Sequence, residues 1–175
     1  MSTATDVRDQ VAELGREFAR EKIEPFAAEW DRTSHFPRDV IDALGKLGFL
    51  GMGTPEEYDG MGLDTVTYLM VLEEISPADA ALAVSVGIHN TIPTTMLVKH
   101  GTAAQKERFL KPMARGEILA GFALSEADAG SDAASLRAQA VRDGKDWVVN
   151  GAKAWSTNAG TADLIMIMAR TDQPN

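Results

Sequence analysis

Apolar side chains recur every three or four positions through the first two-thirds of the chain, which is the spacing of amphipathic helices. The first such stripe predicts one long helix and consists of Val7, Val11, Leu14, Phe18, Phe26 and Trp30. A second stripe begins after Pro37, a residue typical of a first helical position, and ends at Gly48; it consists of Val40, Ile41, Leu44 and Leu47. The N-terminal part of the chain is therefore expected to be helical.

A glycine-rich stretch, residues 48–64, interrupts this pattern and is expected to be a loop. Asp64 can cap the helix that follows, whose apolar positions are Tyr68, Leu69, Leu72 and Ile75. Capping-box patterns at residues 76–79 (Ser-Pro-Ala-Asp) and 102–105 (Thr-Ala-Ala-Gln) predict two further helix starts.

After Gly116 the apolar spacing changes from helical to the short or alternating runs of β-strands. Strands are predicted within "ILAGFAL" (118–124), "SLRAQAV" (135–141) and "DLIMIMA" (163–169). The sequences "RDGKD" and Asn150-Gly151 are typical of hairpin turns, so these strands are expected to be successive and antiparallel. Because an apolar strand left near a sheet edge invites aggregation, we expect further sequence after Asn175, or another chain, to cover it.

Composition narrows the classes of function. With 175 residues, 45% of them hydrophobic, the chain can bury a core in one or two units. The net charge of −9 disfavours binding to nucleic acid or to acidic membranes. The absence of cysteine excludes disulfides, thiolate nucleophiles and cysteine-bound metals. The N-terminal sequence resembles neither a signal peptide nor a transit peptide, and no stretch approaches the length of a membrane span, so a bacterial cytoplasm is expected and a mitochondrial matrix is disfavoured.

Two polar segments in the strand region are candidates for ligand binding. "SEADAGSD" offers the hydroxyls of Ser125 and Ser131, a close backbone approach at Gly130, and N–H groups that could line a phosphate-binding hollow. "KAWSTNAG" places Trp155, Ser156 and Thr157 at an expected strand end, where an indole could pack on a planar cofactor. Taken singly, such a loop is more often a solvated turn, and such a tryptophan more often belongs to a core.

Together, "FALSEADAGSD" and "KAWSTNAG" resemble the acyl-CoA dehydrogenase family. The resemblance extends over essentially the whole chain, because "LGFLGMGTPEEYDGMGLD", "VLEEIS" and "HGTAAQKERFLKPMARGEI" precede them in the family's order. Ser125 stands where the family has threonine, Ala127 where it has proline, and Asp59 where it has glycine. The hydroxyl is thus kept, whereas the rigidity of proline is lost.

The resemblance implies an α+β fold. Residues 1–117 would form the family's helical N-terminal domain, and residues 118–175 part of its middle antiparallel β-barrel domain. A C-terminal four-helix domain completes the family's usual form, with FAD between the middle and C-terminal domains. This chain would then be truncated relative to the family.

The resemblance also implies the site residues. Phe122, Leu124 and Ser125 match positions that contact the isoalloxazine ring of FAD. Ser131 matches a serine beside both the flavin and the acyl-CoA. In the second segment, Trp155 and Thr157 match the tryptophan that packs on the flavin and the threonine whose hydroxyl approaches N5, with Ser156 between them.

The implied activity is oxidation of a saturated acyl-CoA to the trans-2-enoyl-CoA, with hydride transfer to FAD, as in fatty-acid β-oxidation. The family's catalytic base is a glutamate of the C-terminal domain, so we expect no catalytic residue in this chain and no activity from this chain alone. Electron-transfer flavoprotein is the expected electron acceptor, unless the protein is an oxidase, and the complete protein is expected to be a homotetramer. The alternative is a non-catalytic fragment or partner-binding module that needs another chain to complete the active site.

Other candidate residues carry no predicted chemistry. His35, His89 and His100 lack metal-ligand spacing, and Gly48, Gly51 and Gly53 follow a helix and not the strand that a dinucleotide fingerprint requires. Glu73 and Glu74 match a paired acidic position of the family, and we expect a structural role for them, as caps or as partners of a neighbouring basic residue. Three acidic residues lack the spacing of a calcium loop and are assigned to turns and caps; they are Glu126, Asp128 and Asp132. No metal site is predicted.

Overall fold

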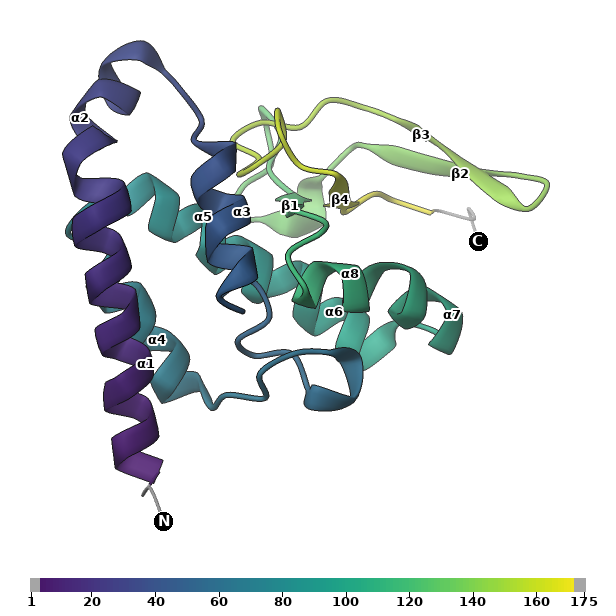
Figure 1. Ribbon diagram of the computed structural model, residues 1–175. Coiled ribbons are helices and arrows are strands. Elements are labelled where there is room, and N and C mark those ends of the chain that lie inside the picture. Colours follow the sequence, from purple (N-terminus) through teal and green to yellow (C-terminus); the bar gives the residue numbers. More distant parts are fainter. Residues whose placement is uncertain (1–3, 172–175) are drawn as a thin grey trace.

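The computed structural model describes residues 4–171, which form a helical body and a smaller strand region (Figure 1). The first residues and Asn175, on which the expectations about targeting signals and continuing sequence depend, lie outside the described residues. The helical elements are α1 Ala4–Phe18, η1 Ala19–Ile23, α2 Glu24–Thr33, α3 Arg38–Lys46, η2 Glu56–Tyr58, α4 Thr65–Ile75, α5 Ala80–Asn90, α6 Ile92–His100, α7 Ala103–Gln105, η3 Lys106–Leu110, α8 Lys111–Ala114 and η4 Ala133–Ser135. The strands are β1 Ala120–Ala123, β2 Gln139–Asp143, β3 Asp146–Asn150 and β4 Leu164–Ile167.

The predicted long N-terminal helix is present as α1, η1 and α2 in direct succession (Figure 1). The η1 segment between them is π-helical, and Pro25 follows it at the start of α2. Because proline has no N–H to donate to the preceding turn, a local change in hydrogen bonding at this point is expected. The predicted helix after Pro37 is also confirmed, as α3.

Two of the three predicted caps are confirmed. Asp64 accepts hydrogen bonds from the backbone N–H groups of Val66 and Thr67, and Thr102 forms a reciprocal capping box with Gln105. The prediction of a capping box that begins at Ser76 is wrong. Helix α5 begins at Ala80, so its cap is Asp79, and the Ser76 hydroxyl instead donates to the carbonyl at the end of α4.

The strands form two two-stranded sheets within residues 4–171, and a closed barrel is not present there. β2 and β3 form the predicted antiparallel hairpin, with Gly144 at its turn (φ +58°). The expectation of antiparallel pairing throughout is wrong for β1, which pairs with β4 in parallel. The hairpin and its flanking loops separate these strands, and a connection of that length can return β4 in the same direction as β1.

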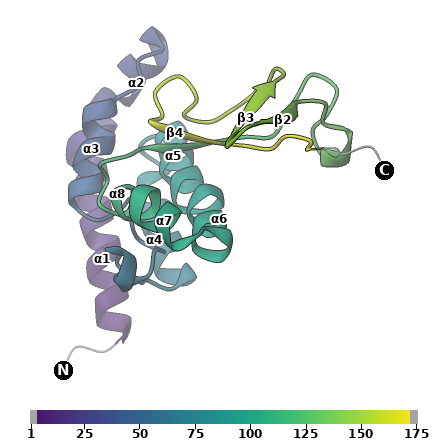
Figure 2. The same cartoon turned by 90° about the vertical axis from the view of Figure 1, so that its right-hand side faces the viewer.

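Asn150-Gly151 does not form a second hairpin turn. β3 ends at Asn150, and the chain continues through a long loop to β4. The hairpin itself projects away from the helices in both views (Figures 1 and 2), and apolar side chains on it are exposed. These exposed side chains are Val141, Trp147, Val148 and Val149.

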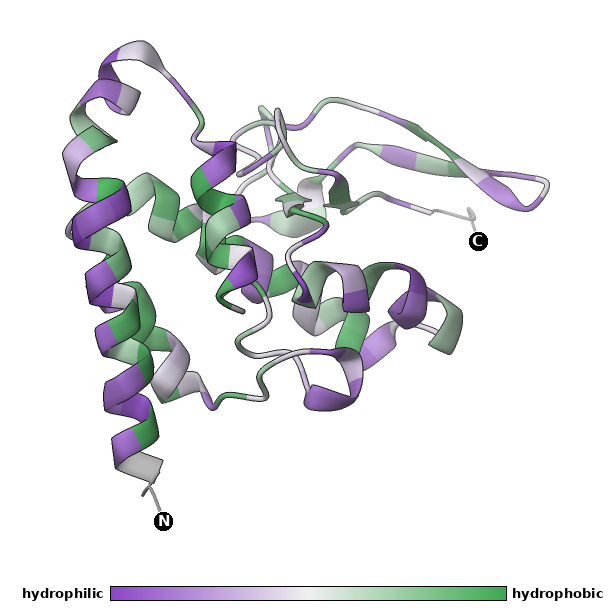
Figure 3. Cartoon of the chain, in the orientation of Figure 1, coloured by the Kyte–Doolittle hydropathy of each residue, from purple (hydrophilic) through white to green (hydrophobic). Residues whose placement is uncertain are grey.

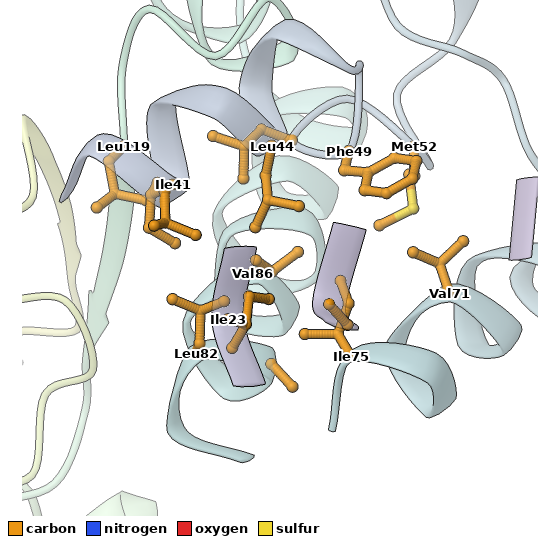
Figure 4. Packing of buried hydrophobic residues seen from close by; sticks show 14 residues of the cluster. Ile23, Ile41, Leu44, Phe49, Met52, Val71, Ile75, Leu82, Val86 and Leu119 are labelled. Carbon is orange, nitrogen blue, oxygen red and sulfur yellow. The ribbon is translucent and has the colours of Figure 1, made fainter. Parts of the chain in front are cut away.

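A hydrophobic core joins the helices to the start of the strand region. Polar and apolar residues alternate along α1 (Figure 3), and the apolar positions of several helices converge on one cluster (Figure 4). The labelled members are Ile23, Ile41, Leu44, Phe49, Met52, Val71, Ile75, Leu82, Val86 and Leu119. A second cluster contains Leu97, Leu110, Met113 and Ala120. Since Leu119 and Ala120 belong to different clusters, both clusters hold the beginning of β1.

One helical stretch within the described residues, Ala80–His100, has the length and apolar composition to cross a membrane, contrary to the expectation from the sequence. Half of its most apolar window is buried inside the protein. Two polar side chains within it form buried hydrogen bonds: Asn90 donates to the carbonyl of Phe49, and His89 accepts from the N–H of Ala120.

Candidate functional site

Strand β1 forms the base of the candidate site and is anchored in the core. Ala120 and Ala123 are buried, and the backbone N–H of Ala120 donates to Nδ1 of His89 at 3.0 Å. Burial lowers the pKa of His89 to about 4, so this imidazole is neutral near pH 7 and Nδ1 is free to accept. Phe122, one of the predicted site residues, lies on this strand, whose start is fixed in the core, and Leu124, another, follows directly after it.

The loop between β3 and β4 lies directly against β1. Asn158 is buried, and its Nδ2 donates to the carbonyls of Ala120 and Ser85, each at 3.1 Å. A Cβ atom at Gly121 would lie only 2.8 Å from the carbonyl oxygen of Thr157, so glycine permits this close approach. The second predicted segment is thus held beside the first.

An ion pair joins the same two segments further along. Lys153 Nζ donates to Glu126 Oε1 at 2.7 Å and to the carbonyl of Leu124 at 2.9 Å. The backbone N–H of Ala154 donates to the carbonyl of Ser125 at 2.9 Å. Residues 124–126 and 153–154 are therefore neighbours in space, as expected if the two segments form one site.

Glu126 also caps the approach to β2. Its carboxylate accepts from the backbone N–H groups of Arg137, at 2.6 Å, and Ala138, at 2.9 Å. The Lys153 ammonium, followed by these two N–H groups, lowers the pKa of the Glu126 carboxyl to about 2. The predicted turn-and-cap role is confirmed for Glu126, and within the described residues no metal-binding cluster is found.

Trp155 does not lie at a strand end, as the sequence predicts, but in the loop after β3. Its side chain is 96% exposed, and its backbone has φ +56°, a conformation that costs a non-glycine residue about 1–2 kcal/mol. Ser156 Oγ beside it is buried without a hydrogen-bond partner among the described residues. An exposed indole in a strained backbone is a feature that a core tryptophan does not have.

The loop of residues 124–132 is open on its outer side. Glu126 and Ala129 bond each other's backbone in a tight turn, so their N–H groups are not available to line a phosphate-binding hollow. Around Gly130 an added Cβ would meet no atom within 4 Å, which leaves room for a ligand. The hydroxyls of Ser125 and Ser131 form no hydrogen bond with another described residue.

The structure thus brings the two predicted segments together, through the backbones of Leu124, Ser125 and Thr157. β1, the turn after it and the loop after β3 meet where Gly121 approaches the carbonyl of Thr157, where Lys153 bonds the carbonyl of Leu124, and where Ala154 bonds the carbonyl of Ser125. Ser131 stands apart on the exposed part of its loop, and no hydrogen bond within the described residues joins it to Trp155.

Three positioning residues were not predicted as such. Lys153 and Asn158 lie within the second segment, and Asn158 adopts φ +67°, which asparagine tolerates better than most residues. His89 was assigned no role. The structure reveals these contacts because their partners are far apart in sequence: Ala120 contacts His89 and Asn158, and Glu126 contacts Lys153.

A separate groove of about 570 Å³ lies between the end of α2 and the start of α5. Trp30, His35, Phe36 and Asp79 line it, and none of the predicted site residues does. The candidate site therefore lies outside this groove.

Comparison with known families identifies both parts of the chain. Residues 5–117 match the acyl-CoA dehydrogenase N-terminal domain, and residues 121–175 match the acyl-CoA dehydrogenase middle domain.

Known proteins are similar to this chain in sequence and, where a structure is solved, in fold. The chain is 38% identical to a 3-(aryl)acrylate reductase of Clostridium sporogenes over 96% of this chain and 45% of the relative. It is 40% identical to the mitochondrial short-chain specific acyl-CoA dehydrogenase of Mus musculus, over 90% of this chain and 38% of the relative. A solved glutaryl-CoA dehydrogenase of Mycobacterium smegmatis, in complex with FADH2, superimposes with a TM-score of 0.88 at 30% identity, over 94% of this chain and 42% of that one. The chain therefore spans less than half the length of these relatives.

Proposed function

Because the chain belongs to the acyl-CoA dehydrogenase family through its N-terminal and middle domains, we propose that it forms the N-terminal part of an FAD-dependent acyl-CoA dehydrogenase. The division would fall between residues 1–117, the helical domain, and residues 118–175, part of a middle β-barrel domain. The observation that carries the proposal is Trp155, an indole that is 96% exposed and held in a strained loop against the end of β1.

The residues present fit an isoalloxazine ring. Trp155 offers an uncovered aromatic face, and Ser125, Ser131 and Ser156 have side-chain hydroxyls without partners among the described residues. A planar ring needs close backbone approach and hydrogen-bond donors at its edge, and small residues permit both. Phe122, Leu124 and Thr157 would complete the contacts.

FAD, when bound, supplies the hydride acceptor for oxidation of a saturated acyl-CoA thioester to the trans-2-enoyl-CoA. The residues of this chain would orient the ring and the thioester: Trp155 and Thr157 on the ring, and Ser131 between ring and thioester. A base must also remove the proton from the carbon next to the thioester carbonyl. We assign that base to a C-terminal domain, to which nothing in residues 1–175 corresponds, and so expect residues 1–175 alone to be inactive.

The proposal extends to the partners of the complete protein. Electron-transfer flavoprotein would reoxidise the flavin, and a homotetramer would be the working assembly, with a role in fatty-acid β-oxidation. The cytoplasmic location stays a prediction.

Purification of the gene product that contains residues 1–175, expressed in full, tests the proposal. We expect a yellow protein that releases FAD on denaturation, identified by its absorbance and mass. A colourless protein that takes up no FAD on reconstitution would contradict the proposal and favour a non-catalytic partner-binding module.

A further inference from the structure

We propose that Glu126 and Lys153 are positioning residues. Their ion pair would fix the loop between β3 and β4, residues 151–163 and here called the Trp155 loop, against the end of β1. This inference rests on the proposed function, since it concerns the same flavin-binding face. It goes further by assigning a role to two residues that would not themselves touch the flavin.

The two side chains of the pair are part-buried and keep little of their exposure. The side chains of Lys153 and Glu126 retain 11% and 10% of their exposure, whereas the Arg16–Glu74 pair between α1 and α4 retains 56% and 23%. Exposed pairs contribute little to stability, and a buried pair is often no better than an apolar pair of the same size. What a pair with little exposure can supply is a defined geometry, because another arrangement would leave a largely covered charge without its partner.

The contacts of the pair connect three backbone segments. Lys153 reaches the carbonyl of Leu124, and Glu126 holds the N–H groups of Arg137 and Ala138. The backbone bond from Ala154 to Ser125 lies beside them. The end of β1, the approach to β2 and the start of the Trp155 loop therefore share one carboxylate–ammonium centre.

The Glu126–Lys153 pair lies next to a strained part of the backbone. Trp155 is two residues beyond Lys153 and has φ +56°, and Asn158 holds the other side of the loop with φ +67°. A strained conformation persists only when its surroundings fix it. Lys153 on one side and Asn158 on the other supply side-chain anchors, so loss of the Lys153 anchor should let the indole leave its place without unfolding the helical body.

Three substitutions in the full gene product test the role. Lys153→Met keeps the apolar stem and removes both side-chain bonds, Glu126→Gln removes the charge, and Lys153→Arg keeps a cation. Glu74→Gln breaks the remote Arg16–Glu74 pair and is the matched control. The readouts are amide hydrogen exchange at Ala154, Arg137 and Ala138, the FAD dissociation constant, and the position of the bound flavin's visible absorption band.

We expect Lys153→Met and Glu126→Gln to weaken FAD binding about tenfold, because a part-buried charged group loses its partner, with faster exchange and a shifted flavin band. Lys153→Arg should recover part of each change, and Glu74→Gln should alter none. Unchanged exchange and unchanged flavin properties in Lys153→Met and Glu126→Gln would overturn the inference alone. An unsubstituted protein that binds no FAD would overturn the proposed function, and the inference with it.

Discussion

The side-chain amide of Asn158 donates a 3.1 Å hydrogen bond to the backbone carbonyl of Ala120, 38 residues earlier in the chain. The same amide donates to the carbonyl of Ser85 in α5, so one buried side chain ties the Trp155 loop to both a strand and a helix. Ala120 is in turn held by His89 of α5. The position of the candidate site is therefore set by the helical body and not by the strands alone.

Replacement of Asn158 separates its two contributions. Asn158→Gly removes both hydrogen bonds, leaves two buried carbonyls without their partner, and should lower the free energy of unfolding by about 1–3 kcal/mol. Asn158→Ala loses the same bonds and must also hold a Cβ at φ +67°, so it should be less stable than the glycine variant by about 1 kcal/mol. Urea denaturation measures both differences. Two variants as stable as the unsubstituted protein would show that these bonds are not important to the fold.

Replacement of Trp155 should affect the cofactor and spare the fold. Its indole is 96% exposed, so Trp155→Ala should leave the unfolding midpoint almost unchanged, while the lost aromatic face weakens FAD retention about tenfold. Trp147→Ala, in the projecting hairpin, is the control and should retain FAD. The FAD content of the full gene product after dialysis gives the measurement, and equal content in Trp155→Ala and unsubstituted protein would remove Trp155 from the site.

Ser131 tests whether the exposed arm of the loop belongs to the site. Its hydroxyl bonds no other described residue, so Ser131→Ala should leave stability unchanged. If the hydroxyl binds flavin or thioester, the substitution should weaken affinity for that ligand by about 1 kcal/mol, or about fivefold. Ser131→Thr keeps a hydroxyl and should keep most of the affinity. Titrations with FAD and acyl-CoA that show no loss in Ser131→Ala would exclude this residue from both contacts.

The buried imidazole of His89 predicts a pH dependence of stability. Burial lowers its folded pKa to about 4 from the unfolded value of about 6.5. Below pH 6.5 the imidazole binds a proton in the unfolded chain but stays neutral in the folded chain. The contribution of His89 to the free energy of unfolding is therefore fully present above pH 6.5 and decreases as the pH falls towards 4. The total loss is at most about 3 kcal/mol. His89→Gln should flatten the decrease between pH 6.5 and 4.5, above the range in which carboxylates such as Glu126 lose their own contributions. His100→Gln is the control, and urea unfolding at several pH values is the measurement; identical pH profiles for His89→Gln and the unsubstituted protein would contradict the assignment.

Local sequence patterns were sufficient for much of the fold. The apolar spacing located α1, α3 and α4, and a single carboxylate, Asp64, was enough to locate a helix start, because these features depend on residues a few positions apart. The Ser-Pro-Ala-Asp motif predicts a helix start at Ser76, which is too early. Both Ser76 and Asp79 are residues that can cap a helix, and Asp79 caps α5.

Long-range contacts could not be predicted in the same way. Parallel pairing of β1 with β4 depends on how the hairpin and loops between them are folded, and the apolar patterns of parallel and antiparallel strands overlap. For the site, the family resemblance predicted Ser125 and Trp155. The sequence did not indicate that Lys153 pairs with Glu126, because other acidic residues lie in the same loop as Glu126.

Anaerobic mixing with saturated acyl-CoA tests the proposed dehydrogenase most directly. The full gene product, loaded with FAD, is mixed with substrates of several chain lengths, the flavin absorption band is followed, and the thioester is analysed by mass. We predict bleaching of the flavin and formation of the 2-enoyl-CoA by the full product, and neither change with residues 1–175 alone plus FAD. Flavin that stays oxidised in the full product with every substrate would contradict the assignment of a dehydrogenase, and bleaching with enoyl product from residues 1–175 alone would contradict the assignment of the base to another domain.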